Sequence, residues 1–174
     1  MPRIFIFFLV FLCSAPAGAF IDSERLGWSD YRNERFGFVM RYPAGVFPSH
    51  RSSASGDGDL FETPDGKARL LVGALPNTEH FSPASYQAFI ARQSYPGLEA
   101  DYAPVRATWT VLSGTIGETM IYEKAMFSCG GELISTFAMT YPVAERGFYD
   151  RLVEGVEHTF RPSPKGCDQD GSSF

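Results

Sequence analysis

The sequence has few of the residues that usually bind metals or carry out catalysis. Three histidines and three cysteines occur among 174 residues, and His50, His80 and His158 are widely separated. No HxH, HxxxH or CxxC spacing places two such side chains together, so no zinc or iron site is expected. The glycines of Leu112–Gly117 match neither the P-loop nor the GxGxxG and GxSxG motifs, and this segment is predicted to connect strands. We therefore expect no cofactor and no enzymatic activity.

Basic side chains are also in the minority. The chain has 15 lysines and arginines against 20 aspartates and glutamates, and its formal net charge is −5. The basic residues form no run along the sequence. Nucleic acids and anionic membrane surfaces attract proteins through clusters of basic residues. Neither is therefore an expected partner.

Long apolar runs are limited to one, Ile4–Leu12, which follows the single charge of Arg3. It is too short to cross a bilayer as a helix. Small residues at Ala17–Ala19 then provide a cleavage site, so residues 1–19 are predicted to be a secretory signal peptide. Cys13 follows a leucine rather than the small residue of a lipid-attachment site. We expect a periplasmic or secreted protein without a membrane anchor after cleavage.

Two cysteines, Cys129 and Cys167, remain after that cleavage. An even number in an exported chain favours a disulfide. The alternative is a reactive thiol at Cys129, which would need a nearby base and a lowered pKa. The flanking sequence FSCGG is more typical of the end of a hairpin. We predict a Cys129–Cys167 disulfide that attaches a short C-terminal tail to this hairpin.

The segment Gly117–Pro142 is predicted to be the central β-hairpin. Gly130 and Gly131 can take the positive φ angles of a type I′ turn, and a two-residue turn determines the strand register. Met120 should then lie opposite Tyr141. The face with larger side chains is predicted to form the main core: Met120, Tyr122, Met126, Leu133, Phe137, Met139 and Tyr141. The other face is expected to pack against a helix: Ile121, Ala125, Phe127, Ile134, Thr136, Ala138 and Thr140.

Alternating apolar residues predict further strands. One covers Glu34–Pro43, and a polar, turn-rich loop is expected over Gly45–Asp59. Asp59–Leu75 is predicted to be a second hairpin that turns at Pro64–Gly66. Its return strand is apolar on both sides, so we expect both faces to be covered. A later strand is predicted over Ala103–Leu112.

Two helices complete the predicted elements. Ser82–Tyr95 begins with a serine N-cap and a proline in the first turn, and Pro96 follows it. Ala144–Phe160 repeats apolar residues at helical spacing, and Gly155 permits the close approach of a neighbour. Short connections favour an antiparallel sheet. The predicted class is α+β, with a largely antiparallel sheet packed with two helices in a single domain over residues 20–174.

Several of these patterns together resemble the PsbP-like superfamily. They are Phe36-Gly37-Phe38 with Tyr42-Pro43 in the first strand, the mid-chain helix, the long hairpin, and Phe148–Asp150 through Thr159–Pro162 near the end. The superfamily includes the PsbP accessory protein of photosystem II, the Mog protein that binds Ran, and bacterial periplasmic relatives. The resemblance implies an antiparallel sheet flanked by helices. It implies no shared activity, because members are accessory or binding proteins with different partners.

Two groups of residues are candidate sites. Asp57, Asp59 and Glu62 are spaced like part of a calcium loop, although the remaining oxygen ligands of such a loop are missing. A solvated turn explains the same pattern. The aromatic residues in or beside loops form a possible binding region: Phe47, Phe81 and Tyr95. The favoured alternative is that they cover the ends of the core.

The leading functional hypothesis is a non-enzymatic accessory or protein-interaction domain in the periplasm, with an unidentified protein partner. The alternative is a periplasmic domain of the same fold that binds a small ligand or a metal. A third hypothesis, a hydrolase or thiol enzyme, predicts a free and titratable thiol at Cys129.

Overall fold

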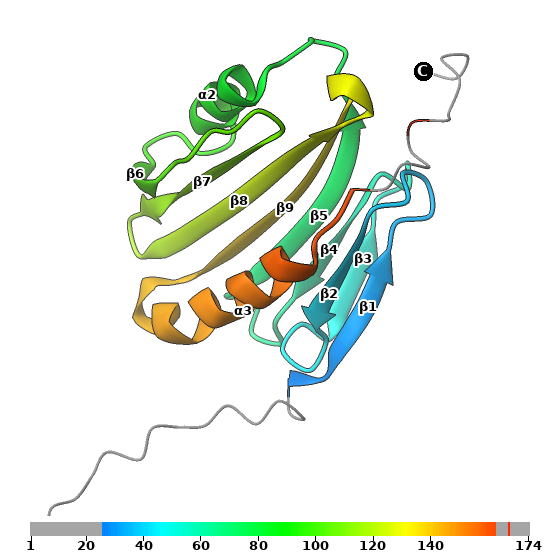
Figure 1. Ribbon diagram of the computed structural model, residues 1–174. Helices are drawn as coiled ribbons and strands as arrows, with labels where there is room; N and C mark the ends of the chain where they lie inside the picture. The colour runs from blue at the N-terminus through cyan, green and yellow to red at the C-terminus, as the bar shows by residue number, and fades with distance from the viewer. Residues whose placement is uncertain (1–25, 163–166, 168–174) are drawn as a thin grey trace, which may run out of the picture.

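The computed structural model describes residues 26–162 and Cys167, and Figure 1 shows their arrangement. The predicted signal peptide and most of the C-terminal tail lie outside these residues. A seven-stranded antiparallel sheet has the strand order β3-β4-β5-β9-β8-β7-β6. Its strands are β3 (Ser49–Ser52), β4 (Gly58–Glu62), β5 (Arg69–Pro76), β6 (Glu99–Tyr102), β7 (Trp109–Ile116), β8 (Thr119–Ser128) and β9 (Leu133–Pro142).

Three further elements cover the sheet. A two-stranded antiparallel ribbon consists of β1 (Trp28–Arg32) and β2 (Val39–Pro43). This ribbon and α3 (Arg146–Thr159) pack on one face, whereas α2 (Pro83–Gln93) packs on the opposite face (Figure 1). The described chain therefore has the predicted α+β architecture, with a largely antiparallel sheet and two helices.

The central hairpin has the predicted register. Met120 lies opposite Tyr141, and Gly130 and Gly131 take positive φ angles of 68° and 106°. The Glu132 N–H donates to the Cys129 carbonyl at 3.2 Å and closes the turn. Only glycine adopts such φ angles without strain, so these two residues determine where β8 ends and β9 begins.

The two faces of this hairpin belong to two different cores, as their side-chain sizes predict. The larger side chains join the main core beneath α3 and the ribbon, where Phe137 and Met139 are fully buried. The smaller face lies under α2, where Ala125, Phe127 and Ile134 contact the helix residues Tyr86 and Ile90, among others.

Both helices follow their sequence signals. Ser82 caps α2 by accepting a hydrogen bond from the Ser85 N–H. In α3 the buried residues recur at helical spacing: Tyr149, Leu152, Val153 and Val156. Gly155 faces Trp28 of β1, and an added Cβ would lie only 2.5 Å from the indole ring. The small residue therefore allows α3 to approach the ribbon closely.

Four strand predictions are corrected by the structure. The strand expected over Glu34–Pro43 is confined to β2, because Glu34–Phe36 form a turn. The expected loop Gly45–Asp59 contains β3 and the start of β4. All four β3 residues are exposed, so this edge strand has no apolar alternation that could reveal it. Strand β5 is interior in the sheet, but Leu71 and Leu75 are 53% and 41% exposed, so its outer face is not covered as expected.

The fourth correction concerns β7, which begins at Trp109, not Ala103, and continues through the segment that was expected to be a connection. Its partner β6 was not predicted. An added Cβ on Gly114 would lie 2.2 Å from the Glu99 carbonyl oxygen. This glycine therefore permits close strand approach rather than breaking the strand.

Candidate functional site

The candidate site is a cleft between α3 and the β6–β8 part of the sheet. It has a volume of about 350 Å³, which is large enough for one extended side chain or a small ligand. We call it the acidic cleft, because four carboxylates contribute to its lining. The lining residues are Asp101, Tyr102, Ser113, Met120, Tyr122, Tyr141, Arg146, Asp150, Val153, Glu154 and Glu157.

The sheet provides one side of the acidic cleft through its register. Ser113 on β7 lies opposite both Tyr102 on β6 and Tyr122 on β8. Residues directly opposite one another in neighbouring strands point to the same face. A tyrosine, a serine and a second tyrosine therefore form one row. Met120 and Tyr141 form part of the adjacent row.

Helix α3 provides the opposite side. Residues at i, i+4 and i+8 lie near one another along a helix, so Arg146, Asp150 and Glu154 follow one side of α3. Arg146 donates from its Nε to Asp150 at 3.1 Å, and its Nη1 lies 3.2 Å from Asp101 on β6. The Tyr141 hydroxyl also donates to Asp150, at 2.7 Å. Arg146 therefore attaches α3 to β6 and offsets one of the two negative charges at this end of the acidic cleft.

A second ion pair occupies the region nearer the end of α3. Lys124 Nζ lies 2.7 Å from Glu157 Oε1 and 4.9 Å from the centre of the Trp109 ring. Burial, followed by the charge of Glu157 and a hydrogen bond to it, raises the pKa of Tyr122. The Tyr122 hydroxyl therefore stays protonated at neutral pH and donates to the same carboxylate.

Two polar groups between these ion pairs have no partner in the described part of the chain. Glu154 is exposed and forms no ion pair or hydrogen bond. Ser113 as a whole is only 4% exposed, but its hydroxyl oxygen stays accessible from the cleft and makes no hydrogen bond. Four carboxylates face two cations, Arg146 and Lys124. The acidic cleft is consequently electronegative and suited to a cationic group, which the tyrosine rings can also attract through their π faces.

The carboxylates predicted to bind a metal are used separately. Asp57 accepts a hydrogen bond from Ser53, whereas Glu62 pairs with Arg69 at 2.9 Å and with Arg51 at 3.4 Å. Among the residues that the structure describes, no group of three histidine, cysteine, aspartate or glutamate side chains could hold a metal ion. The predicted spacing does not bring the three carboxylates together.

Asp59 instead joins the ribbon to the main sheet. It accepts hydrogen bonds from Tyr31 of β1 and from the His50 Nε2, the latter at 2.8 Å. Burial alone would raise the pKa of Asp59, but hydrogen bonds from Ser52, Tyr31 and His50 outweigh it and lower the pKa. The His50 ring also stacks on Phe61, with ring centres 4.8 Å apart. This carboxylate therefore has a structural role.

The three loop aromatics do not form one surface. Phe47 is 1% exposed within the main core and contacts Tyr149, so it presents no surface to a partner. Phe81 and Tyr95 pack beside α2 on the opposite face. The Tyr95 hydroxyl donates to the buried Glu123 at 2.6 Å.

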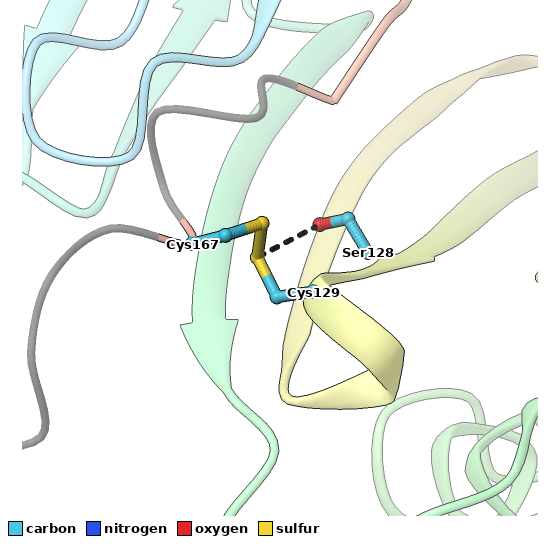
Figure 2. The surroundings of a disulfide bond; sticks show 3 residues. All are labelled: Ser128, Cys129 and Cys167. Carbon is cyan, nitrogen blue, oxygen red and sulfur yellow. Dashed lines mark hydrogen bonds between the residues drawn. A yellow bond between two sulfur atoms is a disulfide. The ribbon is translucent and has the colours of Figure 1, made fainter.

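The structure contains the predicted disulfide between Cys129 and Cys167 (Figure 2). Cys129 immediately precedes the two turn glycines, at the tip of the central hairpin. The bond therefore attaches residue 167, beyond α3, to this tip.

Sequence reasoning did not single out Tyr102, Ser113, Tyr122 or Glu154. Tyr122 is predicted as part of the main-core face of the central hairpin. Two sequence patterns could have indicated the acidic cleft: the tyrosines in the strands and the acidic residues along one side of α3. Because three strands and α3 must come together before these residues meet, neither pattern alone identifies the acidic cleft.

Comparisons with known proteins identify the fold. The chain matches no protein-family model, and no curated protein sequence matches it significantly. It is similar to the solution structure of cyanobacterial PsbP (CyanoP) from Synechocystis sp. PCC 6803, with a TM-score of 0.59 and 13% identity. That match covers 78% of this chain and 92% of the cyanobacterial chain. The chain therefore has the PsbP-like fold expected from its sequence.

A crystal structure from Bacteroides thetaiotaomicron VPI-5482 also overlaps, with a TM-score of 0.45 and 13% identity. The overlap covers 79% of this chain and 49% of that one. Within residues 26–162, no helix is long and apolar enough to cross a membrane.

Proposed function

We propose that this PsbP-like protein is an exported, non-enzymatic accessory protein that binds a positively charged segment of a partner protein in the acidic cleft. The observation that carries the proposal is that Glu154 and the Ser113 hydroxyl, which have no partner among the described residues, line one cleft. Two tyrosine rings, Tyr102 and Tyr122, lie in the same row as Ser113. A lysine or arginine side chain would complete these interactions. Its charge would face Glu154, and its apolar stem would lie against Tyr102 and Tyr122.

The arrangement favours binding over chemistry. The side chains that line the acidic cleft include no histidine, cysteine or lysine that could act on the Ser113 hydroxyl. Asp150 already accepts hydrogen bonds from Tyr141 and Arg146, and Glu157 is paired with Lys124. These two carboxylates are therefore already engaged with neighbouring donors, which leaves Glu154 as the carboxylate available to a bound cation.

Export is supported by two features of the chain. The N-terminal sequence has the features of a signal peptide, and disulfides persist in oxidising compartments such as the periplasm. Intact-mass measurement of protein recovered from the periplasm should give a chain that begins at Phe20 and has no alkylatable thiol without reduction. An uncleaved chain confined to the cytoplasm would contradict the export part of the proposal.

Peptide titrations test the binding part. Lysine-rich and arginine-rich hexapeptides should shift the NMR backbone signals of Tyr102, Ser113 and Glu154, whereas glutamate-rich peptides should not. Glu154→Gln and Tyr102→Ala should each weaken binding about fivefold, because an exposed charge contact or cation–π contact contributes roughly 1 kcal/mol.

Glu79→Gln is the matched control, because it removes the same charge from an exposed position outside the acidic cleft. It should bind the basic peptides like the wild-type protein. Equal affinities of all three variants for the basic peptides, or signal shifts elsewhere on the surface, would exclude the acidic cleft as the binding site.

A further inference from the structure

A second concave surface is formed by the ribbon and the chain around the end of α3. Its charge is positive, opposite to that of the acidic cleft. Strand β2 pairs with β1 on one edge and with Arg161 on the other, through hydrogen bonds of 3.0 Å and 2.9 Å between Val39 and Arg161. Arg32 lies opposite Val39 in the ribbon. Residues opposite one another share a face, so Arg32, Val39 and Arg161 form one row.

The neighbouring row adds a third arginine. Arg41 lies opposite Asp30 and pairs with it at 3.5 Å. The Arg41 N–H donates to the Thr159 hydroxyl oxygen at 2.9 Å, which holds the last turn of α3 against β2. The two rows line a hollow of about 580 Å³, which we call the arginine hollow. Its lining residues are Asp30, Tyr31, Arg32, Val39, Met40, Arg41, Thr159 and Arg161.

Two of these guanidinium groups lack a counter-ion. Within the described residues, Arg32 and Arg161 form no ion pair. Arg32 donates to the Gly37 carbonyl at 3.4 Å, and Arg161 donates to the Phe160 carbonyl at 2.7 Å. Each guanidinium has further N–H donors. Three positive charges and one negative charge therefore line this hollow in a protein whose formal net charge is −5.

The spacing of the row suits an anion. Neighbouring strands lie about 5 Å apart, so the Cα atoms of Arg32 and Arg161 are separated by roughly 10 Å across Val39. Long arginine side chains can converge over that distance on one group. A guanidinium binds carboxylate or phosphate oxygens with two parallel hydrogen bonds, and it favours such oxyanions over other acceptors.

We infer that the arginine hollow is a binding site for a phosphate or carboxylate oxyanion, held between Arg32 and Arg161 and supported by Arg41. The oxyanion is carried by a small metabolite or by the headgroup of an anionic lipid. The site is independent of the acidic cleft, because the two share no lining residue. The basic residues escaped detection in the sequence because residues 32 and 161 are brought together only by the pairing of β2 with the segment after α3.

An NMR-monitored titration of the folded, disulfide-bonded protein with inorganic phosphate tests whether the arginine hollow binds a free anion. Sedimentation with phosphatidylcholine vesicles, with and without phosphatidylglycerol, tests the lipid source. The double variant Arg32→Gln/Arg161→Gln should bind the effective probe at least about tenfold more weakly, since two charge-assisted interactions are lost. Increasing salt should weaken wild-type binding.

The matched control is Arg92→Gln/Arg151→Gln, which removes two exposed helix arginines outside the hollow. It should bind like the wild-type protein, and both double variants should keep the wild-type melting temperature. Phosphate binding identifies the free-anion source, and binding only to phosphatidylglycerol vesicles identifies the lipid source. The inference is overturned if the wild type binds neither probe, or if the two double variants bind equally.

Discussion

Glu123 lies beneath α2 with only 7% of its surface exposed. Burial raises the pKa of this carboxyl, and the hydrogen bond from the Tyr95 hydroxyl offsets part of that effect. A carboxyl whose pKa is higher in the folded state than in the unfolded state binds more protons when folded. Its contribution to stability therefore decreases as the pH rises above the unfolded-state pKa.

Glu123→Gln should remove this pH-dependent loss while keeping an oxygen that accepts from Tyr95. Its melting temperature should match that of the wild type at about pH 4, where the unfolded-state carboxyl is largely protonated. It should exceed that of the wild type at pH 7. Thermal unfolding of both proteins from pH 4 to pH 8 measures the difference. A constant difference across this range would contradict the assigned role of Glu123.

Among the elements, β6 connects the fold to the acidic cleft. It is one of the two edge strands of the seven-stranded sheet, and it carries Asp101 and Tyr102. Its pairing depends on Gly114 of β7, where an added Cβ would lie 2.2 Å from the Glu99 carbonyl oxygen and 2.7 Å from the Ala100 Cα. Because these are backbone atoms, a side-chain rotation cannot relieve the overlap.

Gly114→Ala should therefore separate β6 from β7. We expect a loss of about 1–3 kcal/mol in the free energy of unfolding, the usual cost of forcing extra atoms into a packed site. Urea denaturation measures the loss, and the basic-peptide titration should show weaker binding. Gly147→Ala in α3 is the control, because nothing lies within 4 Å of its added Cβ. Equal stability of the two variants would show that β6 does not need this close approach.

In the whole molecule, the disulfide is the covalent connection between the hairpin tip and the chain after α3. Cys129 and Cys167 are separated by 38 residues. That loop contains β9 and α3, and therefore a large part of the main core. Joining its ends lowers the conformational entropy of the unfolded chain, which stabilises the folded state.

Cys167→Ala should lower the free energy of unfolding by about 2–4 kcal/mol, the typical contribution of a disulfide. Guanidinium denaturation of the oxidised protein measures this loss. Reduction should destabilise the wild type by a similar amount and leave Cys167→Ala unchanged, because the variant has no bond to break. If reduction affects both proteins equally, the loss does not come from this disulfide.

The elements that sequence reasoning predicted correctly are those with a local signal. The two glycines at 130 and 131 determine the register of β8 and β9, and Ser82 marks the start of α2. The strands that it missed lack such a signal. All β3 residues are exposed at the sheet edge, and β6 is similarly exposed, so neither alternates between core and solvent.

The sequence by itself determined the α+β class, the central hairpin and both helices, because turn geometry and side-chain periodicity act over neighbouring residues. The tertiary structure decided which strands are adjacent and hence which polar groups meet. Ser113 and Glu154 line one cleft only because α3 packs across the sheet. Arg32 and Arg161 line one hollow only because the chain after α3 pairs with β2. Periodicity specifies the face on which a residue lies, but the long-range packing of the core specifies its neighbours.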